Sequence, residues 1–336
     1  MIRVNLISET VFSVKGHGVH TAYLEMKKAL DDISGVKIRV NSFRSADITH
    51  IHTVGLYSLM HLLVGRGKKV VNAHVIPDSF VGSLVGAKYW YKLAFWYLKF
   101  FYNRADLVLP VSNQTLEYLK AKMHIEEAKI EVVYNAVNTA EFKFDAKRRK
   151  AMRKKLGIDD DQRLVISVGQ IQPRKRFDLF VRAAKALRDV QFIWVGGMPF
   201  GRLASDFQKY NRQLDNLPEN LSVTGVLKLH DARSYYQAAD MFVLLSDQET
   251  FGTVVVEAAA SGLPIILRDI PDFKQTFADY SLNVTERDYI RQIMELCESQ
   301  KSIKKYSAVA KKIAKRYDNA TQAKQLRALY RNLIRE

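Results

Sequence analysis

The stretch Gln248–Pro264, QETFGTVVVEAAASGLP, places two glutamates, Glu249 and Glu257, with seven residues between them. Its start, ETFGT, is typical of a loop, and residues 254–261 are typical of the helix into which that loop opens. The first N–H groups of a helix have no partner within the helix, so such a start suits a phosphate or sugar hydroxyls. We therefore expect a ligand-binding turn here. The alternative is two exposed glutamates around an ordinary strand-to-helix turn.

Apolar segments flank this helix at Met241–Leu244 and Pro264–Leu267, and the same alternation of short strands and amphipathic helices runs along the chain. In the first half we expect strands at Ile2–Ile7, Lys37–Asn41, Ile48–His52, Lys69–Asn72, Leu107–Pro110 and Ile130–Val133. After residue 155 a second series begins, with strands at Arg163–Val168, Gln191–Val195 and Leu221–Thr224. Such alternation predicts an α/β fold with two doubly wound, parallel-sheet domains.

The length of 336 residues is comfortable for two domains. We place the first domain at residues 1–145 and the second at residues 146–310. The remaining residues, 311–336, have helical spacing and many basic side chains, and we expect this helix to cross back to the first domain.

The composition is that of an ordinary globular protein, with 48% hydrophobic and 26% charged residues. The single cysteine, Cys297, cannot form an internal disulfide, which indicates a reduced, cytoplasmic protein. The start of the chain lacks the pattern of a signal peptide. No apolar run approaches the roughly 20 residues that span a bilayer, so we expect a protein that is soluble or rests on a membrane surface.

The net charge of +17 is unevenly distributed. Residues 143–155, KFDAKRRKAMRKK, hold eight basic residues and one acidic residue, and residues 301–336 hold eleven and two. The stretch between them, 156–300, has a small negative charge. Concentrated basic segments indicate an anionic surface as partner, and both nucleic acid and anionic lipid fit this pattern.

The stretch around Glu249 and Glu257 resembles the E-x7-E signature of retaining glycosyltransferase family 4. Further segments resemble that family's motifs in the correct order: Gly16–Thr21 (GHGVHT), Asp47–His52 (DITHIH), Ala105–Ser112 (ADLVLPVS), Val132–Phe142 (VVYNAVNTAEF) and Gly169–Asp178 (GQIQPRKRFD). The resemblance covers most of the chain. It implies the GT-B fold, in which two Rossmann-like domains face each other across a cleft. The N-terminal domain would then bind the acceptor and the membrane, and the C-terminal domain the nucleotide sugar.

The resemblance also implies roles in donor binding. Lys175 would hold the donor diphosphate, Glu249 the hydroxyls of the transferred sugar, and Glu257 the ribose hydroxyls. Backbone amides of Phe251, Gly252 and Thr253 would line the pyrophosphate and the sugar. The family's usual arginine is replaced by Gln170, so Arg174 or Arg176 would supply the second positive charge that a leaving phosphate needs.

Three further residues follow from the same resemblance. His74 matches the family histidine that reaches the sugar and β-phosphate from the N-terminal domain, and with Lys175 and Glu249 it completes the catalytic set. A lone histidine after a strand is otherwise more often structural. Gly16 and Gly18 would form a loop at the donor phosphate, although a lone Gly-x-Gly is equally typical of a plain turn. We find no Asp-x-Asp that would hold a metal across a diphosphate, so we expect catalysis without a metal or other cofactor.

The segment Tyr89–Tyr102, YWYKLAFWYLKFFY, carries nine aromatic residues and two lysines. One buried stripe does not require aromatics around most of a helix, and Trp, Tyr and Lys favour a bilayer interface. Core packing is the alternative. We expect contact with an anionic membrane through Trp90, Lys92, Trp96, Lys99, Phe100, Lys147, Arg148, Arg149 and Lys150.

Two segments narrow the resemblance: Ala73–Leu84 (AHVIPDSFVGSL) and Leu267–Phe277 (LRDIPDFKQTF) are similar to bacterial diglycosyl-diacylglycerol synthases. The resemblance implies transfer of glucose or galactose from UDP-glucose or UDP-galactose to α-monoglucosyl-diacylglycerol, with retention, by a peripheral enzyme on the inner face of the cell membrane. The alternatives are a family member that acts on a polysaccharide or another soluble acceptor, and a non-catalytic basic protein that binds a surface or nucleic acid. The last is disfavoured because no nucleic-acid module is present in the sequence.

Overall fold

The computed structural model describes residues 1–11, 18–79, 87–198 and 207–335, and the chain divides into two compact units. The first unit contains Met1–Val81, Gly86–Asn138 and Tyr317–Glu336, and the second is formed mainly by Thr139–Arg316. The last helix of the chain therefore belongs to the first unit. The crossings at 138–139 and 316–317 lie close to the predicted boundaries near 145 and 310.

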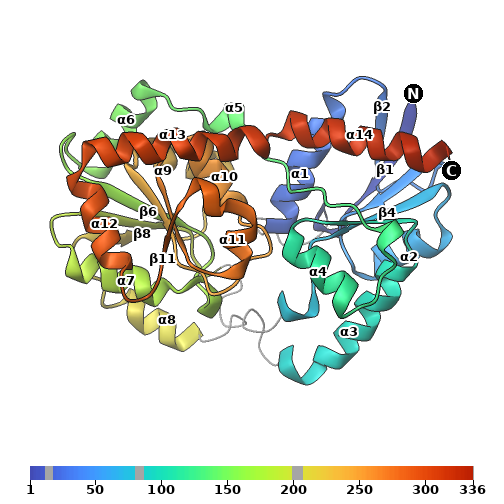
Figure 1. Cartoon of the computed structure of the whole chain (residues 1–336), viewed down its shortest axis with the longest axis horizontal. Helices are drawn as coiled ribbons and strands as arrows, with labels where there is room; N and C mark the ends of the chain where they lie inside the picture. The colour runs from blue at the N-terminus through green and yellow to red at the C-terminus, as the bar shows by residue number, and fades with distance from the viewer. Residues whose placement is uncertain (12–17, 80–86, 199–206, 336) are drawn as a thin grey trace. The chain divides into compact units, whose positions relative to one another are not determined.

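The first unit is built on a parallel sheet with strand order β2-β1-β3-β4-β5 (Figure 1). The strands are β1 (Ile2–Ile7), β2 (Val36–Val40), β3 (Ile48–Ile51), β4 (Lys68–Ala73) and β5 (Leu107–Pro110). The helices are α1 (Gly18–Asp31), α2 (Leu56–Val64), α3 (Ala87–Asn103), α4 (Asn113–Ala121) and α14 (Asn319–Arg335). Figure 1 shows α14 beside α1, with which it packs.

Alternation along the strands gives this sheet two buried faces. Val70 of β4 packs with side chains of α1 and α14, such as Tyr23 and Leu326. Its neighbour Val71 points the other way and packs with side chains of α2, α3 and α4, such as Leu62 and Leu98. Near-continuous apolar strands are buried in this manner in parallel sheets.

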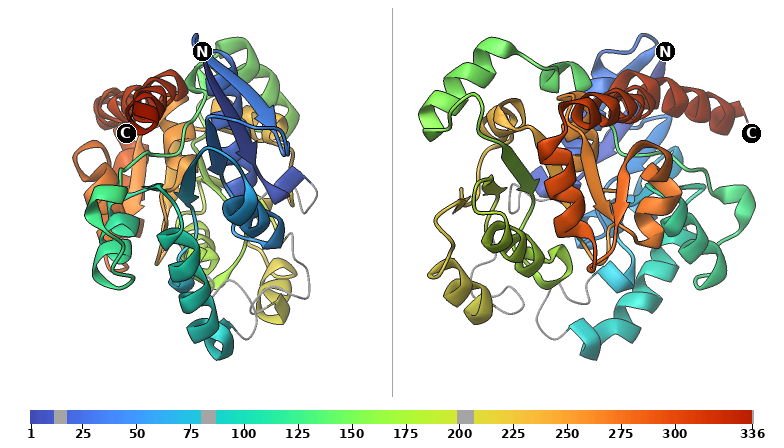
Figure 2. Two further views of the ribbon diagram at one scale, coloured as in Figure 1. Left: turned by 90° about the vertical axis from the view of Figure 1, so that its right-hand side faces the viewer. Right: turned by 60° about the vertical axis from the view of Figure 1, so that its left-hand side comes forward.

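The second unit contains a parallel sheet with strand order β11-β10-β9-β6-β7-β8. Its strands are β6 (Leu164–Val168), β7 (Gln191–Val195), β8 (Leu221–Val223), β9 (Met241–Leu244), β10 (Ile265–Arg268) and β11 (Leu282–Val284). Its longer helices are α6 (Ala146–Leu156), α7 (Phe177–Ala186), α8 (Phe207–Leu214), α9 (Leu229–Ala238), α10 (Thr253–Ala260), α12 (Tyr289–Glu298) and α13 (Gln300–Arg316). Helices cover both faces of each sheet (Figure 2), so the prediction of two doubly wound, parallel-sheet domains is confirmed.

The predicted strand at Ile130–Val133 is wrong. Ile130 forms only an isolated parallel bridge with Val108. The N–H of Val133 does donate to the carbonyl of Pro110 at 3.1 Å, but a proline has no N–H with which to extend the ladder. The segment therefore follows β5 without becoming a strand.

Candidate functional site

The loops after β6 and β9 meet where the strand order of the second sheet reverses. The chain runs from β6 outward through β7 to β8, and then returns to β9 on the other side of β6. Open parallel sheets bind ligands outside the carboxyl ends of the strands at such a switch point. Lys175 lies on the loop after β6 and Glu249 on the loop after β9, so the switch point brings together two residues 74 positions apart.

Lys175 and Glu249 form a buried ion pair. The Lys175 ammonium contacts Oε1 of Glu249, and the two residues are only 8% and 5% exposed. Burial lowers the pKa of Lys175, against the opposing attraction of the Glu249 carboxylate. Burial by itself would raise the pKa of Glu249, but the charges of Lys175 and Arg174 outweigh it and hold that pKa below its usual value.

Two further contacts fix Glu249. The hydroxyl of Ser246 donates to its Oε1 at 2.7 Å. The backbone N–H of Glu249 donates to Oδ2 of Asp272 at 2.6 Å, and Asp272 comes from the helix after β10. Neither residue was predicted from the sequence, although Asp272 lies in the segment LRDIPDFKQTF. The side chain and backbone of Glu249 are thus held before any ligand arrives.

Arg174, rather than Arg176, stands beside this pair. Nη1 of Arg174 lies 3.5 Å from Oε2 of Glu249 and donates to the carbonyl of Gln248 at 3.1 Å. Arg176 instead pairs with Asp178, Asp247 and Glu286 at 2.6–3.2 Å. Of the two arginines that the sequence left open as the second cation, the geometry favours Arg174.

Glu257 lies within α10, and its carboxylate is held by a tyrosine from another helix. The hydroxyl of Tyr236, on α9, donates to Oε2 of Glu257 at 2.6 Å, and both side chains are buried. Burial raises the pKa of Tyr236 well above its ordinary value, so this hydroxyl remains a donor. Tyr236 was not predicted from the sequence, because no motif surrounds it.

The start of α10 depends on the backbone conformation of a glycine. Gly252 has a φ of 83°, which only glycine adopts readily, and it caps the helix that begins at Thr253. The ring of Phe251 is buried and lies 5.8 Å from the ring of Phe277. Contacts from Phe251 with a ligand would therefore be made by its backbone, and its role in donor binding stays a prediction.

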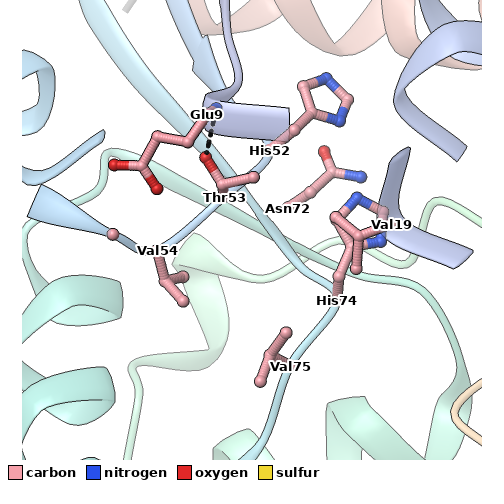
Figure 3. Close-up of a pocket in the computed structure, with 9 residues that line it drawn as sticks. Glu9, Val19, His52, Thr53, Val54, Asn72, His74 and Val75 are labelled. Atoms are coloured by element: carbon pink, nitrogen blue, oxygen red, sulfur yellow. Dashed lines mark hydrogen bonds between the residues drawn. The ribbon is translucent and has the colours of Figure 1, made fainter. Parts of the chain in front are cut away.

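In the first unit, His74 lies beside two other histidines and lines a cavity of about 230 Å³ (Figure 3). The ring of His52 lies 5.8 Å from that of His74 and 4.3 Å from that of His50. Both His50 and His52 are buried, and burial lowers the pKa of His50 to about 4 and that of His52 well below 6.5. Gly18 begins α1, whereas Gly16 lies outside the described residues.

The aromatic helix α3 has one buried side and one exposed side. Leu98, Phe101 and Tyr102 belong to the core of the first unit. Leu93 and Trp96 are 74% and 64% exposed, and Tyr89 and Phe100 continue the same exposed stripe. Lys92 is exposed, Lys99 lies over the Trp96 ring at 5.5 Å, and Trp90 is half-buried. One side of α3 thus packs in the core, and the other side is available at the surface.

A second apolar surface, on α2, was not anticipated. Leu56 is 81% exposed, and Met60, Leu63 and Val64 are exposed as well. Both α2 and α3 cover the same face of the first sheet, because side chains of both belong to one core cluster. In a sequence, an apolar helix predicts a buried helix. The exposure of these α2 side chains is therefore seen only in the structure.

The basic side chains of α6 differ in their exposure to solvent. Lys147, Arg148 and Lys150 are exposed. Arg149, in contrast, donates to the carbonyls of Ala238 and Ala239 at 2.8 and 2.7 Å and pairs with Asp240 at 2.7 Å. Its guanidinium therefore holds the end of α9, which corrects the expectation of a freely available surface charge.

The helices and the metal-ligating side chains of the described residues bear on a membrane or a metal. In the ranges 1–11, 18–79, 87–198 and 207–335, no helix is long and apolar enough to cross a membrane. Within the same ranges, no group of three or more His, Cys, Asp or Glu side chains is arranged to hold a metal ion. Transfer without a metal stays a prediction.

The sequence matches two family models. Residues 148–316 match glycosyl transferases group 1, and residues 15–141 match glycosyltransferase family 4. The chain is 30% identical over 322 residues to the alpha-galactosylglucosyldiacylglycerol synthase of Streptococcus pneumoniae, which covers 94% of this chain and 86% of that protein. It is 25% identical over 274 residues to the processive diacylglycerol alpha-glucosyltransferase of Acholeplasma laidlawii, covering 80% of each.

Solved structures share the fold at low identity. Anabaena Alr3699/HepE, in complex with UDP and glucose, has a TM-score of 0.80 at 18% identity, over 99% of this chain and 100% of that chain. The sucrose-phosphate synthase of Thermosynechococcus elongatus has a TM-score of 0.80 at 16% identity, over 99% of each chain. These likenesses confirm the predicted GT-B fold.

Proposed function

Since the chain belongs to glycosyltransferase family 4, as its motifs predicted, we propose that it transfers glucose or galactose from a UDP-sugar to α-monoglucosyl-diacylglycerol, with retention at the anomeric carbon. One observation carries the donor half of this proposal: the switch point of the second unit gathers the buried side chains of Lys175 and Glu249 and the partly exposed side chain of Arg174 into one cluster. Cations beside a hydroxyl-binding carboxylate match a sugar diphosphate, which is anionic at one end and rich in hydroxyls at the other.

The residues of this cluster have distinct parts in the proposed reaction. Lys175 and Arg174 stabilise the negative charge that develops on the leaving diphosphate. Glu249, fixed by Ser246 and Asp272, accepts hydrogen bonds from hydroxyls of the transferred sugar. Glu257 accepts from the ribose. Backbone N–H groups of residues 251–253 face the diphosphate at the start of α10.

The proposed transfer follows a front-face course. The leaving diphosphate takes the proton of the acceptor hydroxyl, and the new bond forms on the face from which the diphosphate departs, so the configuration is retained. His74 supplies a hydrogen bond to the donor sugar from the first unit. No metal ion is required, since the two cations carry the neutralising role.

The lipid acceptor rests on two supports. The relatives from S. pneumoniae and A. laidlawii are both named for diacylglycerol glycolipids. The exposed apolar stripe of α3, with Lys92 beside it, also suits the interface of an anionic membrane. We therefore place the enzyme peripherally on the inner face of the cell membrane.

A single assay tests the proposal. Purified protein is incubated with UDP-[14C]glucose or UDP-[14C]galactose and α-glucosyl-diacylglycerol in anionic micelles, with EDTA in a parallel reaction. We expect labelled diglycosyl-diacylglycerol with one of the donors, an α-linkage by NMR, and no loss of product with EDTA. Absence of labelled glycolipid with both donors would overturn the lipid assignment. Label in an added soluble glycan instead would establish the alternative acceptor.

A further inference from the structure

A closed ring of four charged side chains lies at the carboxyl ends of strands in the second sheet. Two arginines, Arg176 and Arg268, alternate in it with two carboxylates, Asp247 and Glu286. Nη1 of Arg176 lies 3.2 Å from Oδ1 of Asp247 and 2.6 Å from Oε1 of Glu286. The guanidinium of Arg268 contacts the same two carboxylate oxygens. Each carboxylate of this charged ring therefore accepts from both arginines.

The charged ring connects four neighbouring strands. Arg176 follows β6, Asp247 follows β9, Arg268 ends β10 and Glu286 follows β11. These strands are adjacent in the sheet, in the order β11-β10-β9-β6. The charged ring thus joins the two loops that meet at the switch point, after β6 and after β9, to the strands on one side of it.

Two members of the charged ring are close to the donor cluster along the chain. Arg176 directly follows Lys175, and Asp247 lies two residues before Glu249. The backbone N–H of Asp247 also donates to the carbonyl of Arg174 at 2.7 Å. The loop with the cations and the loop with the carboxylate are therefore joined twice, by this backbone hydrogen bond and by the side chain of Arg176.

The backbone of Arg176 has a left-handed conformation, with a φ of 53° and a ψ of 48°. Glycine adopts this conformation readily, whereas a Cβ atom disfavours it. Such residues persist where the surrounding structure determines their conformation, and they cluster at functional sites. The side chain of Arg176 is only 18% exposed and pairs with Asp178 at 3.0 Å in addition to the charged ring. A glycine would suit this backbone better but would lose all of these contacts.

The charges of this group argue against direct binding of the diphosphate by Arg176. The hydrogen bond from Arg176 lowers the pKa of Glu286, so this carboxylate is ionised at neutral pH. With Asp178 included, two arginines face three carboxylates, which leaves a net charge of −1. The guanidinium of Arg176 is thus neutralised by its own partners, and its contacts fix loops instead.

We propose that Arg176 is a positioning residue of the donor site, which holds the loops of Lys175 and Glu249 in the binding arrangement before the donor arrives. The inference rests on the proposed function. Without the Arg176 side chain, the two loops occupy this arrangement for only part of the time. The apparent Kd rises by the inverse of the competent fraction, so a fraction of about 0.1–0.2 raises the Kd for UDP about five- to tenfold. A bound donor restores the arrangement, and kcat therefore changes little.

Arg176→Gly tests the side chain without adding backbone strain, because glycine adopts a φ of 53° readily. The Kd for UDP by isothermal titration calorimetry and the KM for the UDP-sugar should both rise about five- to tenfold, while kcat stays within about twofold of the wild type. Arg163→Gln is the matched control. Arg163 precedes the amino end of β6 and donates to the carbonyl of Cys297 at 3.0 Å and to Oε1 of Gln300 at 3.2 Å. This variant should keep the wild-type Kd and KM.

The separate changes in Kd and kcat distinguish three roles of Arg176. A lower Tm with a wild-type Kd and KM would show that Arg176 only stabilises the fold, and would overturn the inference. A lower kcat with an unchanged Kd would also overturn it, because Arg176 would then act on the leaving diphosphate as a second cation. A higher Kd with a nearly unchanged kcat supports the positioning role.

Hydrogen exchange separates this inference from the proposed function, since it requires neither donor nor acceptor. The amide of Asp247, which donates to the Arg174 carbonyl, should exchange at least about fivefold faster in Arg176→Gly than in the wild type, as measured by NMR. The Arg163→Gln variant should exchange as the wild type does. Unchanged exchange in Arg176→Gly would overturn the inference, even for an active enzyme. Faster exchange in this variant, with a wild-type protein that binds UDP but transfers no sugar, would refute the proposed function alone.

Discussion

The hydroxyl of Tyr236 on α9 donates a 2.6 Å hydrogen bond to Oε2 of Glu257 on α10, and both side chains are buried. A carboxylate held from behind in this way has fewer orientations to lose when a ribose arrives. The bond therefore links the packing of two helices to the proposed affinity for the nucleotide.

Tyr236→Phe should accordingly weaken UDP binding. The ring and its packing remain, but Glu257 loses the hydrogen bond from this hydroxyl, and a hydrogen bond to a charged group is worth about 1.5–3 kcal/mol. Only part of this free energy should be lost from UDP binding, so we expect a five- to tenfold higher Kd for UDP by isothermal titration calorimetry. Tyr235→Phe is the control, because Tyr235 neighbours it on α9 and is only half-buried. Equal affinities for both variants would contradict the positioning role.

The Lys175–Glu249 pair predicts a pH dependence of donor use. Burial lowers the pKa of Lys175, so in the free enzyme this lysine loses its charge at a lower pH than an exposed lysine does. The kcat/KM for the UDP-sugar should therefore fall as the pH rises through the alkaline range. Lys175→Arg keeps its charge throughout this range, and its kcat/KM, although lower, should lose the alkaline decline.

A second substitution checks the same pair from the carboxylate side. Glu249→Gln removes the negative charge but keeps the size, so Lys175 and Arg174 keep their positions without their counter-charge. UDP binding should persist, since the diphosphate replaces that counter-charge, while turnover should fall by at least about a hundredfold, as for other lost transition-state contacts. Full turnover would show that Glu249 does not touch the transferred sugar.

Features that depend on local sequence patterns could be predicted from the sequence. The strand and helix alternation predicted both sheets, and the spacing of Glu249 and Glu257 predicted a loop and helix start that the structure contains. Their partners Asp272 and Tyr236 come from other elements, and only the folded sheet brings them near. No periodicity in a sequence carries that information.

The two arginines that flank Lys175 show the same limit. Arg174 and Arg176 are indistinguishable in the sequence PRKRF, and we left both open. The backbone of Arg176 has a φ of 53°, and its side chain meets Glu286, which is 110 residues away. The choice between them therefore depends on long-range contacts, as does the difference between exposed Arg148 and Arg149 held against α9.

The buried histidines predict loss of stability in mild acid. Burial keeps the pKa of His50 near 4 and that of His52 well below 6.5 in the folded protein, whereas the unfolded chain protonates near pH 6.5. Between these values the unfolded state binds more protons, so stability falls as the pH decreases below about 6.5, by up to roughly 1.4 kcal/mol per pH unit for each histidine. Above that pH, these two histidines should cause no loss of stability.

His52→Phe tests this linkage. The aromatic ring is kept, and neither ring nitrogen of His52 has a hydrogen-bond partner among the described residues, so little is lost at neutral pH. The Tm of this variant should decline less than that of the wild type between pH 7 and 5. Exposed His230→Ala is the control and should follow the wild type. Identical slopes for His52→Phe and the wild type would refute a contribution from His52.

One basic residue of helix α6 is almost wholly inside the protein. Arg153 is almost fully buried, donates to the carbonyl of Ala238 at 3.0 Å and pairs with Asp240 at 3.2 Å. Breaking a buried pair typically costs about 3–5 kcal/mol, so Arg153→Met should lower the urea midpoint strongly. Arg148→Met, on the exposed side of the same helix, should change stability by less than about 0.5 kcal/mol. A small effect of Arg153→Met would mean that water replaces its contacts.

The exposed stripe of α3 predicts that membrane binding depends on apolar side chains as well as charge. Leu93→Ser with Trp96→Ser removes two exposed side chains, each worth about 1.5–3 kcal/mol when fully buried, so the bound fraction in flotation with phosphatidylglycerol vesicles should fall by more than tenfold. Leu56→Ser with Val64→Ser extends the test to α2. Phe144→Ser with Val226→Ser is the matched control, because both residues are equally exposed at 54% but belong to the second unit. High salt should weaken binding of every variant, since exposed lysines and arginines are screened. If the α3 pair floats as well as the control pair, the apolar stripe does not enter the bilayer, and charge alone attaches the protein.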